Sequence, residues 1–89
     1  MYGWDEAKRQ HNLAKHGTDF ADMERFDWSD GVIINDMRHD YGEVRHSVTR
    51  TIDARLHVCV FTSRKGRVRI ISLRKANKRD SAKWHASIK

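Results

Sequence analysis

Two arginines end the two most strand-like segments of this sequence, and their type and position suit phosphate chemistry. The segment RLHVCVFTSR ends at Arg64, and VRIISLR ends at Arg74. Strict alternation would put Thr62 on the face of Arg64 and Ser72 on the face of Arg74, each continuing an apolar face. Arginines fixed on strands in this way would preorganise positive charge around a phosphate. The alternative, that they are edge residues paired with surplus acids, stays open.

Groups able to transfer protons lie elsewhere in the chain. RNA is cleaved without a metal when its 2′-OH attacks the adjacent phosphate. This reaction needs a base for the hydroxyl, an acid for the departing 5′-oxygen and cations for the charged phosphorane. Histidine suits both proton transfers because its unperturbed pKa lies near neutrality. The candidates are His16, His39, Tyr41, Glu43 and His46. Any of these histidines could equally be structural, and the sequence does not say which group is the base.

The positive charge of the chain is concentrated at its C-terminal end. Residues 64–89 hold ten lysines and arginines against one acid, Asp80, whereas residues 1–63 hold eight bases and eleven acids. This asymmetry is typical of a site for a polyanion, with an acidic protein partner as the alternative. The cations and the hydroxyl expected to contact RNA are Lys15, Arg67, Arg69, Ser72, Lys75, Lys78 and Arg79.

Several other classes of protein are disfavoured. The chain has no P-loop, no GxGxxG and no cysteine cluster, so we expect no cofactor, and Asp36, His39 and Asp40 are the only weak suggestion of a metal site. Cys59 lies in an apolar strand and reads as a buried, inert thiol. No run approaches the roughly 18 apolar residues of a membrane helix. The N-terminus lacks a signal-peptide core, so we expect one cytoplasmic domain over residues 1–89.

The elements that would position these groups follow from caps, turns and alternation. Asp5 is a good N-cap for a helix that runs to about His16, and Gly17 suits its left-handed C-cap. Thr18 or Asp19 would cap a second, shorter helix. Strands are predicted over residues 32–37, 45–52, 55–64 and 68–74, with tight turns at 53–54 and 65–66. Residues from 76 onward have helical composition. This order predicts an α+β fold with two N-terminal helices, a four-stranded antiparallel sheet and a C-terminal helix.

Four motifs together resemble a known family. They are WDEAKRQHNLAKHG, DMRHDYGEVR, VFTSR and RVRIISLRKANKRD, which span nearly the whole chain in order. Each is weak alone, but the set is similar to the BrnT family of bacterial type II toxins. The resemblance implies a RelE-like fold and a ribonuclease that stops translation. It also implies a helical BrnA antitoxin that neutralises the toxin, with the pair repressing its own operon at operator DNA.

Carried onto this sequence, the resemblance marks four groups of residues. They are Lys15, His16 and Gly17; Asp40, Tyr41, Gly42, Glu43 and Arg45; Thr62 and Arg64; and Ser72, Arg74 and Ala76. Two positions depart from the family pattern, because Asp80 and Trp84 stand where a glutamate and a tyrosine are common. Trp84 could pack on the sheet or stack on a base.

These inferences combine into one expectation and two rivals. We expect a metal-independent endoribonuclease in which Arg64 and Arg74 hold the scissile phosphate and a 2′,3′-cyclic phosphate is formed. His16 or Glu43 would be base or acid, and Tyr41 would orient a nucleotide by stacking. The rivals are a non-catalytic nucleic-acid-binding module and a partner protein whose basic face holds an acidic antitoxin segment. For the toxin, the oligomeric state stays open between a homodimer and a heterotetramer with the antitoxin.

Overall fold

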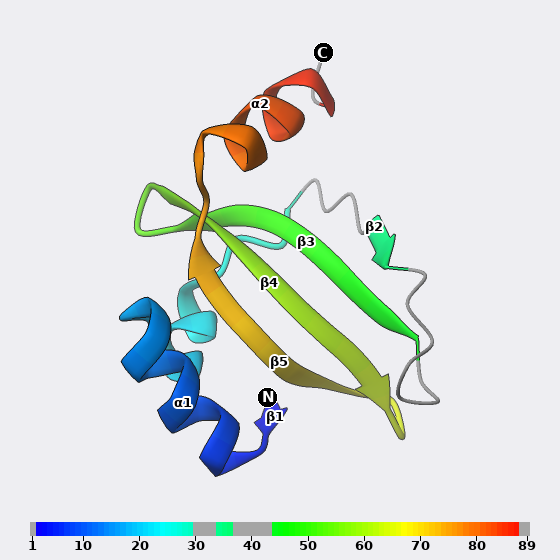
Figure 1. Cartoon of the computed structure of the whole chain (residues 1–89). Coiled ribbons are helices and arrows are strands. Elements are labelled where there is room, and N and C mark those ends of the chain that lie inside the picture. The colour runs from blue at the N-terminus through cyan, green and yellow to red at the C-terminus, as the bar shows by residue number, and fades with distance from the viewer. Residues whose placement is uncertain (1, 30–33, 37–43, 88–89) are drawn as a thin grey trace.

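The structure is a computed structural model that describes residues 2–29, 34–36 and 44–87 (Figure 1). Its elements are β1 (Gly3–Trp4), α1 (Glu6–His16), the 3₁₀ helix η1 (Phe20–Arg25), β2 (Ile34–Asp36), β3 (Arg45–Ile52), β4 (Arg55–Arg64), β5 (Arg67–Lys75) and α2 (Lys78–Ser87). The predicted bounds of α1, β3 and β4 are confirmed. The predicted second helix is a 3₁₀ helix. Of its two predicted caps, Thr18 and Asp19, the structure has Asp19.

The sheet differs from the prediction in one strand and one direction. It has five strands in the order β1-β5-β4-β3-β2. Neighbours from β2 to β5 are antiparallel as predicted, but β1 pairs with β5 in parallel, Gly3 opposite Arg69 and Trp4 opposite Ile70. The sheet is therefore mixed. Because β1 is only two residues long, its pairing depends on the exposed edge of β5 and leaves no strand pattern in the sequence.

Both predicted hairpin turns are present, and their backbones explain their register. Asp53 and Ala54 have φ of 50° and 66°, and Lys65 and Gly66 have φ of 53° and 75°. Two consecutive residues with positive φ are the geometry of the two-residue turn that matches strand twist. These turns fix β3 against β4 and β4 against β5.

The N-terminal helix begins and ends where its caps predict. The Asp5 side chain accepts from the Lys8 backbone N–H, and Gly17 adopts the left-handed conformation with φ of 70°. Arg9 then joins α1 to η1, because its guanidinium contacts both Glu6 at 2.6 Å and the η1 cap Asp19 at 2.9 Å. The two helices are thus fixed relative to each other.

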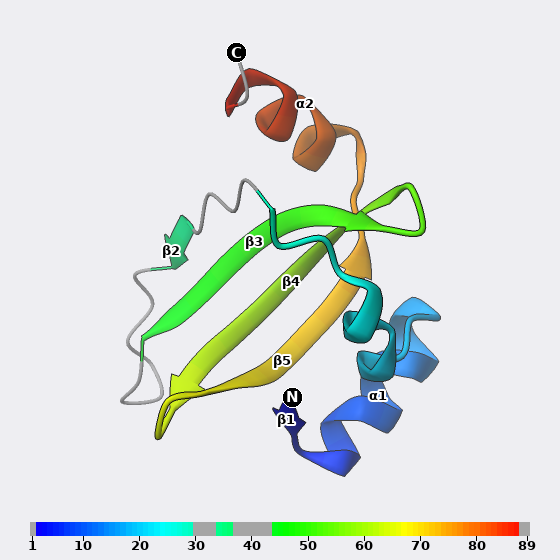
Figure 2. The same ribbon diagram turned by 180° about the vertical axis from the view of Figure 1, so that it is seen from behind.

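The hydrophobic core lies on one face of the sheet, beneath η1. Its strand residues are Val48, Ile52, Cys59, Phe61, Ile70 and Leu73, and the others are Phe20 and Met23 from η1 and its C-cap Phe26. Figure 2 shows η1 on this face, and Figure 1 shows the opposite face. Cys59 is fully buried and its burial raises the pKa of the thiol to about 12, as expected for an inert cysteine. The opposite face is left for the candidate site.

An irregularity in β5 corrects the predicted faces of that strand. Phe61 pairs with Ile70 and Val60 pairs with Ser72, so Ile71 is an extra residue with no partner on β4. Ile70 and Leu73 consequently both face the core, where their exposed fractions are 1% and 0%. Ser72 and Arg74 therefore lie on the face opposite Ile70, not in register with it as strict alternation predicted.

Candidate active site

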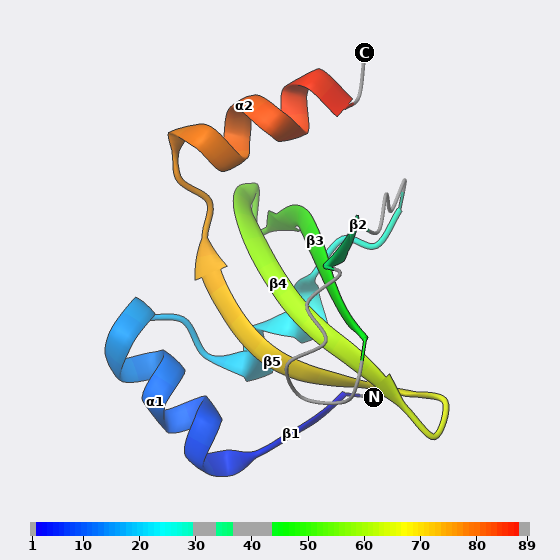
Figure 3. The same cartoon turned by 45° about the vertical axis from the view of Figure 1, so that its right-hand side comes forward.

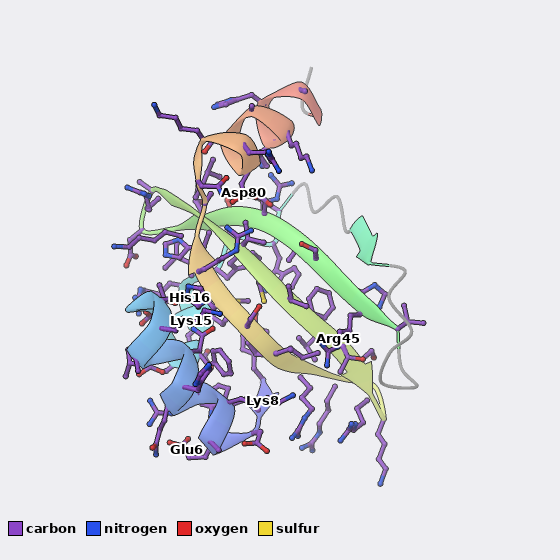
Figure 4. The ribbon with its side chains drawn as sticks, viewed as in Figure 1. Glu6, Lys8, Lys15, His16, Arg45 and Asp80 are labelled. Atoms are coloured by element: carbon purple, nitrogen blue, oxygen red, sulfur yellow. The ribbon has the colours of Figure 1, made fainter. Side chains whose placement is uncertain are left out.

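The open face of the sheet carries a cavity of about 460 Å³ between α1 and β5. Its lining residues are Lys8, His11, Asn12, Lys15 and His16 from α1, Arg45 from β3, and Ile71 and Ser72 from β5. Figure 4 shows Lys15 and His16 at the end of α1 beside β5, with Arg45 at the start of β3. The lining residues that the structure describes are three strong cations, two imidazoles, an amide, a hydroxyl and one apolar side chain, and include no carboxylate. The structure thus joins three sequence-predicted residues, Lys15, His16 and Ser72, in one place.

A buried amide holds α1 against β5 at this cavity. Asn12 is 4% exposed, and its side-chain amide bonds to the backbone of Leu73 as a neighbouring strand would. Its Nδ2 donates to the Leu73 carbonyl at 2.7 Å, and its Oδ1 accepts from the Leu73 N–H at 3.1 Å. The Thr18 hydroxyl donates to the same carbonyl at 2.5 Å. These bonds satisfy the β5 edge beyond β1 and fix which side chains of α1 face the bulge at Ile71.

Five lining residues were not predicted as site residues from the sequence alone: Lys8, His11, Asn12, Arg45 and Ile71. Lys8, His11 and Lys15 are spaced by three and four residues, which places them along one stripe of α1. That spacing was the available signal, although a charged helix stripe is more often a solvated surface. Arg45 was marked only by the family resemblance, and nothing in the sequence identified Asn12 as a buried residue.

His16 has the electrostatic properties of a general base. Burial lowers its pKa below 6.5, and the nearby positive charges of Lys15, Arg74 and His11 lower it further. A lowered pKa keeps the imidazole neutral at pH 7, so a ring nitrogen can accept a proton. The same interactions place Arg74 near the cavity, although it is not among the lining residues.

Arg74 is held by Asp80, the acid of the C-terminal helix. The two terminal nitrogens of Arg74 donate to the Asp80 carboxylate at 2.5 and 3.2 Å. Asp80 also accepts from the Asn77 backbone N–H at 2.9 Å, while Asn77 Oδ1 accepts from the Asp80 N–H at 2.8 Å. This reciprocal cap begins α2, which extends beyond the end of the sheet (Figure 3). Arg74 keeps its Nε and further N–H groups for another ligand.

Arg64 does not meet Arg74, because antiparallel strands end at opposite ends of a sheet. Arg64 pairs with Arg67 at the 65–66 turn, whereas Arg74 pairs with Val58 toward the other end. About six residue steps separate the two arginines along β5, which is roughly 20 Å. The structure therefore does not bring them to one phosphate. Thr62 is 2% exposed and donates to the Val44 carbonyl instead of facing a cleft.

The other predicted residues lie in several different places. Arg67 is exposed and Arg69 half-buried near the 65–66 turn, whereas Lys75, Lys78 and Arg79 are exposed around the start of α2. His46 lies on the core side, with its ring 5.2 Å from that of Phe61. Tyr41 and Glu43 lie outside the described residues, as do His39, Asp40 and Gly42. The described residues contain no group of three metal-ligating side chains.

A second, larger hollow of about 990 Å³ lies on the core side of the sheet. Its lining is largely aromatic, with Tyr2, Phe26, Trp28 and Phe61, and its charged lining residues are Glu24 and Arg67. Trp28 Nε1 donates to the Tyr2 hydroxyl, so these two polar groups of the hollow already bond to each other. Since the described lining of this hollow has one base and no imidazole, the smaller cationic cavity is the better candidate for phosphate chemistry.

The fold and the cavity define a class before any comparison. A small α+β domain that gathers lysine, arginine and histidine around one cavity has the features of a protein that binds phosphate groups. The comparison with protein families agrees. The family described as ribonuclease toxin, BrnT, of type II toxin–antitoxin systems matches residues 4–80.

The chain therefore belongs to the BrnT family of ribonuclease toxins. Membership implies a ribonuclease toxin and an antitoxin partner. No curated protein matches the chain significantly. Within the described residues, no helix combines the length and the apolar composition that crossing a membrane requires.

Proposed function

We propose that this chain is the toxin of a type II toxin–antitoxin pair and cuts RNA by internal transesterification without a metal. The observation that carries the proposal is the cationic cavity, in which Lys8, Lys15 and Arg45 meet His16 over the β5 bulge. Like charges gathered in one place repel one another, and a bound polyanion offsets that repulsion. A phosphodiester is the polyanionic ligand that a ribonuclease toxin must hold.

In the proposed reaction the chain supplies charge and proton transfer. Neutral His16 accepts the proton of the 2′-OH, whose oxygen then attacks the neighbouring phosphorus. The bond to the 5′-oxygen breaks as that oxygen takes a proton from an acid of the site, which leaves a 2′,3′-cyclic phosphate and a 5′-hydroxyl. Lys8, Lys15 and Arg45 stabilise the extra negative charge of the phosphorane, and Ser72 donates a hydrogen bond. No water and no covalent intermediate take part.

Arg74 acts beside this cavity in the proposal. Its position two residues after Ser72 on the same face of β5 supports contact with a phosphate bound there, and the Asp80 pair holds its side chain in one orientation. Lys75, Lys78 and Arg79 would bind flanking phosphates. Cations in the first turn of a helix are unfavourable for the helix dipole, which supports a functional rather than a structural role for Lys78 and Arg79.

The remaining predicted residues keep more distant roles. Near the 65–66 turn, the RNA strand would be steered by Arg64, Arg67 and Arg69. Arg64 would therefore contact a flanking part of the RNA and not the scissile phosphate. Tyr41 and Glu43 stay proposals for base stacking and proton transfer. The physiological setting proposed is the cytoplasm, where cleavage blocks translation. A BrnA-like antitoxin would neutralise the toxin by covering the cavity, and the pair, as a heterotetramer, would bind operator DNA.

The test is cleavage of RNA by the purified chain in EDTA, with the product ends identified. Wild-type protein should yield 2′,3′-cyclic phosphate ends. Lys15→Ala and Arg74→Ala should lower the rate by about 10²-fold each, the usual cost of removing one transition-state donor. Lys83→Ala and Arg55→Ala are matched controls, because both side chains are exposed and outside the cavity.

Two results would contradict the proposal in different ways. Cleavage that stops in EDTA and returns with a divalent cation would refute the metal-independent mechanism. Salt-dependent RNA binding without cleavage, with and without ribosomes, would favour the non-catalytic binding module instead.

A further inference from the structure

Two histidines line the cationic cavity, although sequence analysis singled out only one of them. His11 and His16 are five residues apart on α1, which corresponds to about 140° around the helix and about 7.5 Å along it. They therefore approach the cavity from different sides, with the clamped amide of Asn12 between them. They are also close enough to interact, because the charge of His11 contributes to lowering the pKa of His16.

The proposed cleavage needs two proton transfers at opposite sides of one phosphorus. The attacking 2′-oxygen and the departing 5′-oxygen lie roughly in line, so one group cannot serve both within hydrogen-bond reach of about 3 Å. Two imidazoles that flank a cavity meet this requirement. If His16 accepts the proton of the nucleophile, the other side of the site needs an acid.

The other lining residues are poor candidates for that acid. Lysine has an ordinary pKa near 10.4 and arginine keeps its proton, so neither gives up a proton readily at neutral pH. Ser72 is a far weaker acid, and Asn12 has both ends of its amide bonded to Leu73. His11 is exposed, and its imidazole is the remaining lining group of a type that commonly serves as a general acid.

We propose that His11 is a second catalytic residue, which protonates the departing 5′-oxygen of RNA while His16 deprotonates the 2′-OH. This inference rests on the proposed ribonuclease function and assigns the two roles that the sequence left open. The proton that His16 takes up and the proton that His11 releases balance, so the step needs no other reactant. Within the described residues, the charged or titratable groups that line the cavity together with His11 are Lys8, Lys15 and His16 from α1 and Arg45 from β3.

The first experiment is the pH dependence of cleavage at one mapped site, for wild-type protein and His11→Gln. The wild-type rate should be bell-shaped, because His16 must be neutral and His11 must be protonated. His11→Gln should be at least about 10²-fold slower, and its rate should no longer fall on the alkaline side. His85→Gln, an exposed histidine of α2, is the matched control and should leave the profile unchanged. Thermal unfolding of each variant confirms folding.

A second substrate separates an acid from a merely structural residue. An RNA with sulfur in place of the 5′-bridging oxygen has a leaving group that departs without protonation. His11→Gln should cleave this RNA at close to the wild-type rate, whereas His16→Gln should stay slow because its defect is in the attack. Rescue of His11→Gln and not of His16→Gln would establish the two roles.

The outcomes that overturn the inference differ from those that overturn the function. Wild-type cleavage with an unchanged rate and profile in His11→Gln would refute the role of His11 alone. An equal loss on both substrates would also refute it, since a displaced helix slows both. No cleavage by the wild type, with or without ribosomes, would refute the ribonuclease and the acid with it.

Discussion

The amide of Asn12 should be among the most sensitive positions of the fold, and Asn12→Ala measures this. The substitution removes both bonds to Leu73 and the bonds to Thr18, all within buried structure. The Leu73 carbonyl keeps the Thr18 hydroxyl, but its N–H loses the one partner that the described residues supply. A buried N–H left unpaired costs about 1–3 kcal/mol, and each lost bond about 1 kcal/mol.

The expected loss of unfolding free energy is about 2–3 kcal/mol, which is less than the sum of these contributions. Asn12 also lines the cavity, so water can enter the vacated space and bond to the exposed edge of β5. For a domain of this size the loss corresponds to a decrease in Tm of about 10–20 °C. It is a large share of the 5–15 kcal/mol that stabilises a typical domain.

Urea unfolding of Asn12→Ala and Gln10→Ala, followed by circular dichroism, checks the calculation. Gln10 is an exposed amide on the same helix with one long hydrogen bond of 3.3 Å to Glu6. Its loss should change the unfolding free energy by less than about 0.5 kcal/mol. If both variants were equally stable, the amide would not clamp β5, and the reasoning that places α1 would be wrong.

Three further predictions follow from other contacts. Arg74 lowers the pKa of Asp80 below 3.8, so Asp80→Asn should reduce the unfolding free energy by about 1–3 kcal/mol at pH 7. The difference between the variant and the wild type should disappear as pH falls through the lowered pKa, and urea unfolding at pH 7 and at a pH below that pKa measures it. Lys15→Met removes a positive charge that lowers the pKa of His16, so that pKa should rise but stay below 6.5, because burial still lowers it. The acidic limb of the cleavage profile should move to higher pH, which pH–rate profiles test. Ala54→Gly should raise the unfolding free energy by about 0.5–1 kcal/mol, because Ala54 has φ of 66°, and an unchanged urea midpoint would contradict that.

Local signals in the sequence predicted the local parts of the fold. Asp5 and Gly17 bracket α1 as capping residues should, and the two hairpin turns take the left-handed backbone expected of tight connections. The parallel strand β1 could not be predicted, because two residues carry no periodicity and their partner is 66 residues away. The extra residue at Ile71 also has no local signature, since every residue from Arg67 to Lys75 fits an ordinary strand.

The candidate site was predicted in part, for a physical reason. Lys15, His16 and Ser72 meet because α1 lies along β5, which the sequence did not show. Arg64 and Arg74 were grouped by similar positions in their strands, yet antiparallel pairing separates them. His11 was not among the predicted candidates, and its spacing of five residues does not place it on the same helical face as His16. A cavity that reaches both sides of a helix does not need them to share a face.

The bulge at Ile71 connects the core to the chemistry. Ile70 and Leu73 are three residues apart and both buried in the same core, which an evenly alternating strand cannot achieve. The extra residue resolves this conflict and turns Ile71 and Ser72 together toward α1, where both line the cavity. It also gives Arg74 the face on which it approaches His16 and reaches Asp80. The bulge at Ile71, which made the predicted faces of β5 wrong, is therefore the feature that assembles the candidate site. Bulges commonly have this role, because one added residue redirects side chains without interrupting the sheet on either side.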